Sequence, residues 1–326
     1  MKIGIYGAGA IGGFLGARLG ARGHAIAAVA RGATLAALQR DGLRLRMQDA
    51  ELAVPVTASD DPRELAVQDL VVVAVKAPAM AAVARGIAPL LGPDTIVLTA
   101  MNGVPWWFFA GMGGPLAETP LATLDPDGAI AAAIPAARVA GCVVHAACTS
   151  PAPGVVQHVM GQRLIVGEPA GGVSPRLASL VATLTDTGFE ASASPRIQQD
   201  IWYKLWGNMT MNPVSAFTGA TVDRILDDPL ANGFCRAVMN EAKAIGAAIG
   251  CPIEQTADDR NAVTRKLGAI RTSMLQDVAA GKPIELDALL TVVREIAQRA
   301  GVATPNLDAL LGLTRVFARA HGLYPA

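Results

Sequence analysis

The residues that most constrain the fold stand at the start of the chain, where a short apolar run leads into a glycine-rich turn. The run Lys2–Tyr6 has the composition of a buried strand, helix-forming residues continue through Leu19, and a second apolar run begins at Ala25. The turn between strand and helix consists of Gly7, Ala8, Gly9, Ala10, Ile11 and Gly12. In such a unit the first glycine permits the tight turn, the second lets a pyrophosphate approach, and the third lets helix and strand pack closely. The sequence therefore predicts an α/β fold with a doubly wound parallel sheet that binds a dinucleotide at a helix N-terminus.

The end of the second apolar run indicates which dinucleotide is bound. The run from Ala25 to Ala30 ends at Arg31. An acidic residue at this position would accept a hydrogen bond from a ribose 2′-hydroxyl, whereas arginine offers donors to a 2′-phosphate. We therefore predict that NADP(H) is preferred over NAD(H); the alternative is a solvated surface arginine.

Composition excludes several other classes of protein. The 326 residues include 27 Lys and Arg against 27 Asp and Glu, and 52% of them are hydrophobic, which suits two domains with large cores. With no net charge and no basic block, nucleic acid is not an expected partner. The four cysteines follow no metal-ligand spacing, so we predict no metal site, and thiols in a reducing compartment.

The apolar content also raises the question of a membrane protein. Two stretches contain no charged residue, Thr95–Ala117 and Val139–Gln162. Prolines and glycines interrupt both, so neither is expected to form a helix across about 30 Å of hydrocarbon. The amino terminus lacks the pattern of a signal peptide. We therefore expect no membrane partner and a cytoplasmic location.

Further strands are predicted in the first part of the chain, and two of them end in polar residues. Leu70–Val75 ends in Lys76, and Thr95–Thr99 ends near Asn102. Because open α/β sheets bind ligands beyond the carboxyl ends of their strands, both polar residues are candidate site residues. The other predicted strands are Leu43–Met47, Glu51–Val56, Val139–Ala147, Val155–Val159, Arg163–Val166 and Phe189–Ser192. Residues 1–193 are thus predicted to form the NADP(H)-binding domain.

From Ile197 onward the pattern has helical periodicity, and residues 194–326 are predicted to form an all-α domain. Within Ile201–Met211 and just beyond it, Lys204, Asn208 and Asn212 recur every four residues. At about 100° per residue they fall within an arc of about 80° and form one polar stripe. A lysine flanked by amides suits a carboxylate and a carbonyl; the alternative is a solvated helix face. Further helices are predicted over 229–249, 257–280, 285–300 and 306–320.

Together these features resemble the ketopantoate reductase family (2-dehydropantoate 2-reductase). The resemblance spans essentially the whole chain and is most specific in the polar stripe of Lys204 and in the pair Ser273 and Glu285. It implies a Rossmann domain followed by an all-helical domain like the C-terminal domain of 6-phosphogluconate dehydrogenase. It also implies NADPH-dependent reduction of a small 2-keto acid, ketopantoate, to pantoate in pantothenate biosynthesis. It leaves a homodimer open.

The resemblance also implies roles for individual residues. Lys204 would be the general acid, and Glu285 would lie near the reacting centre and the cofactor. Cofactor contacts would come from Gly7 to Gly12, Arg31, Lys76, Asn102, Glu285 and the backbone of Ala146. Substrate contacts would come from Asn102, Lys204, Asn208, Asn212 and Ser273. We expect the site to lower the pKa of the Lys204 ammonium by desolvation.

One departure from the family bears on the substrate. The best-known members of the family carry a further substrate-binding asparagine about ten residues after the position of Asn212, where this chain has Phe217–Val222 without an amide. The stretch Trp106–Phe109 is also unusually aromatic. An alternative within the same family is therefore an NADP-dependent reductase of a different 2-keto acid. An alternative of another class is an NADPH-binding regulator without turnover.

Overall fold

A computed structural model describes residues 1–325, which form two compact units. The sheet unit comprises Met1–Met101 and Asp127–Ile197, and the helical unit comprises Asn102–Pro126 and the chain from Gln198 onward. The predicted division after residue 193 lies close to the last crossing between units. The prediction assigned Asn102–Pro126 to the first domain. In the structure this segment belongs to the helical unit, although it follows a strand of the sheet. Its contacts are with residues far away in the sequence, which a sequence pattern does not reveal.

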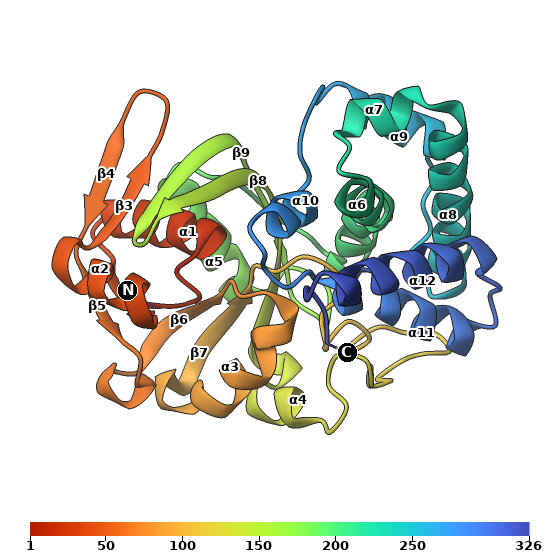
Figure 1. Ribbon diagram of the computed structural model, residues 1–326. Helices are drawn as coiled ribbons and strands as arrows, with labels where there is room; N and C mark the ends of the chain where they lie inside the picture. Colours follow the sequence, from red (N-terminus) through yellow and green to blue (C-terminus); the bar gives the residue numbers. More distant parts are fainter. Residues whose placement is uncertain (326) are drawn as a thin grey trace. The chain divides into compact units, whose positions relative to one another are not determined.

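The sheet unit contains one ten-stranded sheet with a doubly wound core (Figure 1). The central order β5-β2-β1-β6-β7-β8 is parallel throughout. This order is that of a dinucleotide-binding fold, so the predicted Rossmann-type sheet is confirmed. The strands are β1 Lys2–Tyr6, β2 Ala25–Val29, β3 Leu43–Arg46, β4 Glu51–Val54, β5 Val56–Ser59, β6 Gln68–Val73, β7 Leu91–Thr99, β8 Val139–Ala152, β9 Val155–Gly167 and β10 Glu190–Ala193.

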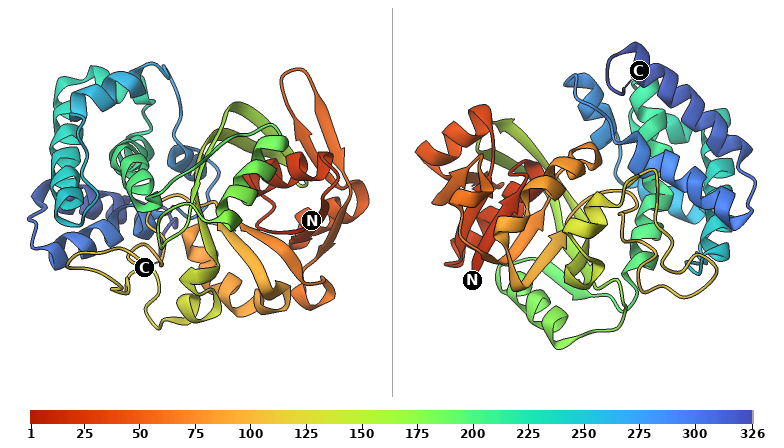
Figure 2. Two further views of the ribbon diagram at one scale, coloured as in Figure 1. Left: turned by 180° about the vertical axis from the view of Figure 1, so that it is seen from behind. Right: turned by 90° about the horizontal axis from the view of Figure 1, so that it is seen from below.

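Helices cover both faces of this sheet (Figures 1 and 2). Helices α1 and α5 share one apolar core, in which Phe14 meets Phe189 edge to face at 5.1 Å between ring centroids. Helices α3 and α4 pack together on the other face. The helices of this unit are α1 Ala10–Ala21, α2 Gly32–Asp41, α3 Met80–Gly86, α4 Ala129–Ala133 and α5 Pro175–Asp186, with short 3₁₀ turns η1 Pro62–Glu64, η2 Ala77–Ala79, η3 Ala88–Leu90 and η4 Ala136–Arg138.

The helical unit is built around α6, which is held by two tryptophans. The indole N–H groups of Trp202 and Trp206 donate to the carbonyls of Ala242 and Met239 on α8, at 3.2 and 2.8 Å. Both side chains are buried. The elements are α6 Ile197–Thr218, α7 Val222–Asp227, α8 Pro229–Ala248, α9 Ala257–Arg265, α10 Ser273–Ala279, the π-helical turn η5 Asp287–Thr291, α11 Val292–Ala300 and α12 Pro305–Ala320.

Three elements differ from the sequence-based expectation. Strand β5 is separate from the hairpin strand β4, and the two strands expected between Val155 and Val166 are one strand, β9. The helix expected over 257–280 is two helices, α9 and α10, because Gly268 at φ 68° follows the last turn of α9.

Two further findings concern expectations from composition. Of the helices within residues 1–325, none combines the length and apolar character needed to cross a membrane. All four cysteines are thiols, three of them buried and Cys148 half-buried. Burial raises the pKa of the Cys148 thiol to about 12.

Two glycines of α8 are expected to respond oppositely to the same substitution. A Cβ at Gly246 would collide with the indole of Trp202 and lie 2.6 Å from the carbonyl oxygen of Cys251, whereas one at Gly233 would meet nothing within 4 Å. Gly246→Ala should therefore destabilise the protein by about 1–3 kcal/mol. Gly233→Ala should stabilise it by about 0.5–1 kcal/mol through helix propensity. Calorimetric melting curves of both variants check this, and a rise in Tm for Gly246→Ala would contradict the packing described.

Candidate active site

The three glycines of the opening turn have three different environments. Gly7 has φ 99°, and a Cβ there would lie 2.7 Å from the side chain of Val75. A Cβ at Gly12 would collide with the carbonyl oxygen of Gly7. A Cβ at Gly9 would meet nothing within 4 Å. The first and third glycines are thus required by the protein's own packing, whereas the second leaves open space beside the backbone.

This space lies at the N-terminus of α1. Gly9 is the N-cap of the helix and has no side chain to cap it, and the first turn contains no acidic residue. The first N–H groups of a helix lack intrahelical partners and favour an anion. The turn from Gly7 to Gly12 therefore fits the diphosphate of a dinucleotide.

Arg31 stands where the second strand ends. It is exposed, it precedes α2, and its guanidinium makes no hydrogen bond or ion pair with another residue between 1 and 325. Burial raises the pKa of the nearby Tyr6 phenol, and the charges of Arg31 and Arg85 oppose this shift. The carboxyl ends of β1 and β2 therefore carry positive charge, which suits a phosphate.

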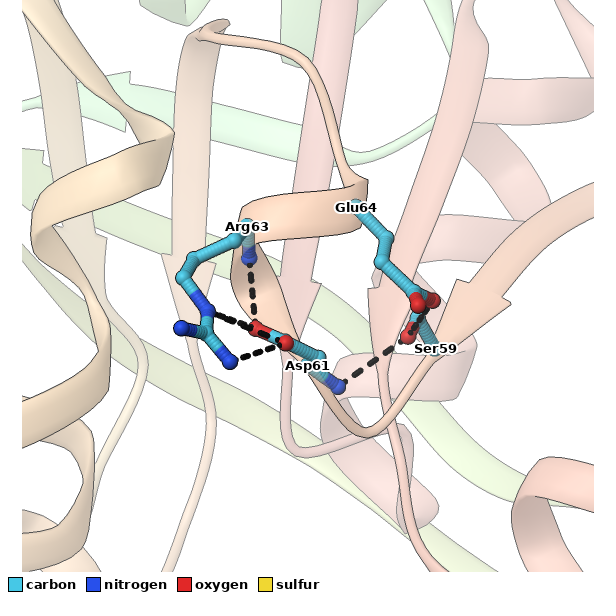
Figure 3. Close-up of polar contacts among 4 residues, drawn as sticks. All are labelled: Ser59, Asp61, Arg63 and Glu64. Atoms are coloured by element: carbon cyan, nitrogen blue, oxygen red, sulfur yellow. Dashed lines mark hydrogen bonds and ion pairs between the residues drawn. The ribbon is translucent and has the colours of Figure 1, made fainter.

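The loop beside Arg31 is fixed by its own polar contacts (Figure 3). Ala30 donates its N–H to the carbonyl of Ser59, so this loop follows β5 next to the end of β2. Ser59 donates through Oγ to Glu64 at 2.6 Å and accepts from the Asp61 N–H at 3.0 Å. Arg63 pairs with Asp61 at 2.6 Å, which lowers the pKa of that carboxyl group.

Two other predicted cofactor residues also lie in the sheet unit. Lys76 is half-buried and follows β6, where its carbonyl starts the turn η2. Ala146 lies on β8 between His145 and Ala147, at a shift in the pairing with β9 that leaves it out of the ladder. The strand pairing is thus irregular at the residue predicted to make a backbone contact to the cofactor.

In the helical unit the structure joins two predicted residues directly. Lys204 of α6 donates from Nζ to Oδ1 of Asn102 at 2.9 Å, and both side chains are half-buried. Asn102 comes from the segment after β7 and Lys204 from a helix 102 residues later. Sequence reasoning placed both at a ligand site but gave no sign that the two share one structural unit.

The remaining polar residues of the predicted stripe also have the expected character. Asn212 is only 6% exposed and Asn208 is half-buried. Neither amide makes a side-chain hydrogen bond within the part of the chain that the structure describes. Two amides without side-chain partners beside Lys204 on one helix are therefore open to a polar ligand. Ser273 is the exposed first residue of α10, and half-buried Glu285 lies just before η5.

The aromatic stretch Trp106–Phe109 is part of the core of the helical unit. All four side chains are buried, and the ring of Phe108 lies 6.0 Å from that of Trp202. At about 100° per residue, Trp202 lies on the side of α6 opposite Lys204. Phe108 therefore packs away from the polar stripe. Among the described residues no group of three His, Cys, Asp or Glu side chains is placed to hold a metal ion.

Comparison with known proteins identifies the family. The family described as "Ketopantoate reductase PanE/ApbA" matches residues 3–171, and its C-terminal counterpart matches residues 196–318. This chain belongs to the ketopantoate reductase family. It is an oxidoreductase acting on CH–OH groups, and the cofactor of the family is NADP(H).

Individual relatives agree with this membership. A 2-dehydropantoate 2-reductase of Mesorhizobium japonicum is 44% identical over 325 residues, which cover 99% of this chain and 100% of the relative. A crystal structure from Ralstonia solanacearum, provisionally assigned as a ketopantoate reductase, is 59% identical, with a TM-score of 0.96 and 99% coverage of both chains.

More distant structures share the fold. A D-mandelate dehydrogenase solved with NADH and anilino(oxo)acetate is 21% identical, with a TM-score of 0.85 over 99% of this chain and 100% of the other. A dimeric ketopantoate reductase from Staphylococcus aureus is 20% identical, with a TM-score of 0.75 and the same coverage.

The glycine geometry leads to a prediction that separates binding from folding. Gly9→Ala adds a methyl group where the protein leaves open space, so we expect an unchanged Tm and NADPH binding weakened about tenfold or more. Gly12→Ala adds it against the carbonyl of Gly7 and should instead lower Tm. Fluorescence titration with NADPH and thermal melts of both variants measure this. Tight NADPH binding by Gly9→Ala would argue against a diphosphate at this turn.

Proposed function

We propose that this chain reduces 2-dehydropantoate to pantoate with NADPH, and that Lys204 donates the proton. The observation that carries the proposal is the half-buried hydrogen bond from the Lys204 ammonium to Asn102, beside two amides without partners. NADPH, when bound, supplies the hydride for the keto carbon. The residues proposed to hold it are Gly7 to Gly12, Arg31, Lys76, Asn102, Ala146 and Glu285.

The chemistry required of the protein is the stabilisation of negative charge on the keto oxygen. An ammonium placed beside that oxygen stabilises its negative charge and can then transfer a proton to it. Asn102 fixes the direction of the Lys204 side chain from one side. Glu285 is proposed to act near the same centre through hydrogen bonding and orientation.

The substrate itself is proposed to be held by the same face of α6. Asn208 and Asn212 offer amide donors and acceptors for the hydroxyl and carboxylate groups of a 2-keto acid, and Ser273 adds a hydroxyl from the start of α10. A single helix face with one cation and two amides matches a small anion with several oxygen atoms.

A different 2-keto acid is the second candidate substrate. The segment Phe217–Val222 carries no amide at the position where family members have a further substrate-binding asparagine. A site with fewer groups dedicated to the substrate hydroxyl discriminates less against analogues that lack it. The ratio of kcat/KM for ketopantoate to that for its analogue without the hydroxyl decides between the two.

We also propose that the chain forms a homodimer. The support is the dimeric relative from Staphylococcus aureus, whose fold covers 99% of this chain.

The central prediction concerns Lys204. Lys204→Ala should lower kcat by at least about 10²-fold, because the general acid and the oxyanion partner are both lost. NADPH affinity should stay nearly unchanged, and Lys266→Ala, which removes an exposed lysine from the end of α9, should behave like wild type. NADPH oxidation with ketopantoate measures kcat. Near-normal turnover in Lys204→Ala would remove Lys204 from the mechanism.

A further inference from the structure

The segment that carries Asn102 rests on a π-helical turn. The N–H of Val104 donates to the carbonyl of Ala288 in η5 at 3.0 Å. Between Asn102 and Val104, Gly103 has φ 82°, and a Cβ there would collide with the same carbonyl oxygen and lie 2.8 Å from the Cβ of Ala288. Only a residue without a side chain allows the backbone to approach η5 this closely.

The π-helical turn is itself held in place from the end of the chain. Ile284, before the turn, donates its N–H to the carbonyl of Leu323 at 3.1 Å. The hydroxyl of Tyr324 donates to Asp287 at 2.6 Å. Burial, together with this hydrogen bond, raises the pKa of Tyr324 to about 12, so the phenol remains a donor at neutral pH. The surface that receives Gly103 is therefore rigidly supported.

We propose that Gly103 and the turn η5 are positioning elements of the active site. Their contact determines where Asn102 lies, and Asn102 in turn directs the ammonium of Lys204. Glu285 lies two residues before the same turn. The proposal rests on the proposed role of Lys204 and adds residues that do not touch the substrate. π-Helical turns are rare in proteins, and those that occur are often located at functional sites.

A double-mutant cycle tests this proposal. Gly103→Ala should lower kcat at least about tenfold, because Asn102 is displaced from Lys204. In the Asn102→Ala background the same substitution should change kcat by less than about twofold, since the group through which Gly103 acts is already absent. Gly301→Ala is the matched control, because Gly301 has φ 69° but no neighbour within 4 Å of its Cβ position. It should leave kcat within about twofold of wild type.

A milder variant keeps the test valid if Gly103→Ala does not fold. Tyr324→Phe removes only the hydrogen bond to Asp287, and its smaller effect on kcat should also disappear in the Asn102→Ala background. If either substitution lowers kcat by the same factor in the wild-type and the Asn102→Ala background, the proposal is overturned. That result is distinguishable from a failure of the proposed function, in which Lys204→Ala itself retains turnover.

An independent observation concerns the outer side of α12, which is apolar. Leu313 and Val316 are 60% and 68% exposed, although the helix already buries its core side with Leu307, Leu310 and Leu311. Ala309 and Ala320 extend the exposed row at intervals of four, three and four residues. This is the spacing of a helix seam that packs against another helix. The helix is in front of its unit in Figure 1 and at its edge in Figure 2.

The charges beside this row favour a second copy of the same helix. Asp308, which pairs with Arg294 of the same chain at 2.8 Å, lies near the N-terminus of α12, and Arg315 and Arg319 lie near its C-terminus, all along one edge of the row. In an antiparallel pair related by a two-fold axis, the acidic part of this edge faces the basic part of the partner's edge. A Cβ at Gly312, next to Leu313, would meet nothing within 4 Å, so the helix surface is open at this position.

We infer that two copies of this chain pair through antiparallel α12 helices; this rests on the proposed homodimer. The variant carrying Leu313→Glu and Val316→Glu should change the mass measured by light scattering from two chains to one, with kcat unchanged. The matched control Leu230→Glu alters a leucine that is 83% exposed on α8 and should remain dimeric.

The outcomes separate the two proposals about assembly. A double variant that stays dimeric, or a Leu230→Glu variant that becomes monomeric, would overturn the α12 interface while the homodimer stands. A wild-type chain that is monomeric at micromolar concentration would overturn both. Turnover by Lys204→Ala reports on the proposed reaction independently of these masses.

Discussion

The rotation of helix α6 about its own axis is the constraint on which the helical unit depends. Trp202 and Trp206 lie on one side of this helix, and each indole donates to a carbonyl of α8. These buried bonds fix α6 in one rotational setting. At about 100° per residue, Lys204 and Asn208 then lie on the other side. The apolar contacts of the core thus determine where the polar residues point, although none of the tryptophans takes part in the proposed chemistry.

Those parts of the fold that depend on neighbours in sequence could be predicted from it. The opening strand, glycine turn and helix follow one another directly, and each glycine has the environment that its position in the motif implies. The polar stripe on α6 could be predicted for the same reason. Helical periodicity alone brings Lys204, Asn208 and Asn212 to one face. The family resemblance added the reaction, and the comparisons confirm the family.

The features that sequence could not supply depend on long-range contacts. Nothing local in Asn102–Pro126 indicates that it packs with elements much later in the chain, such as the π-helical turn at Ala288. The bond from Lys204 to Asn102 exists only through that packing. Strand β5 was merged with its neighbour because Pro55 separates two short strands that pair with different partners, β3 and β2. In each of these cases the structure depends on contacts with a backbone segment that is distant in the sequence. The periodicity of apolar residues does not reveal such contacts.

The loop after α6 clarifies how this protein can treat its substrate. The hydroxyls at this loop and at the end of α6 form local bonds: Ser215 donates to the carbonyl of Ala220, Thr218 to the carbonyl of Val214, and Thr221 to Asp223. These groups stabilise the loop, so they do not replace the amide that family members place there. In the proposed site, Asn208 and Asn212 would then be the main groups that recognise a substrate hydroxyl. When a substrate lacks its hydroxyl, fewer polar groups of such a site are left without a hydrogen bond, so the loss of binding free energy is smaller. Under the proposed function, we therefore expect this chain to discriminate less strictly among branched 2-keto acids while it retains the proposed proton donor.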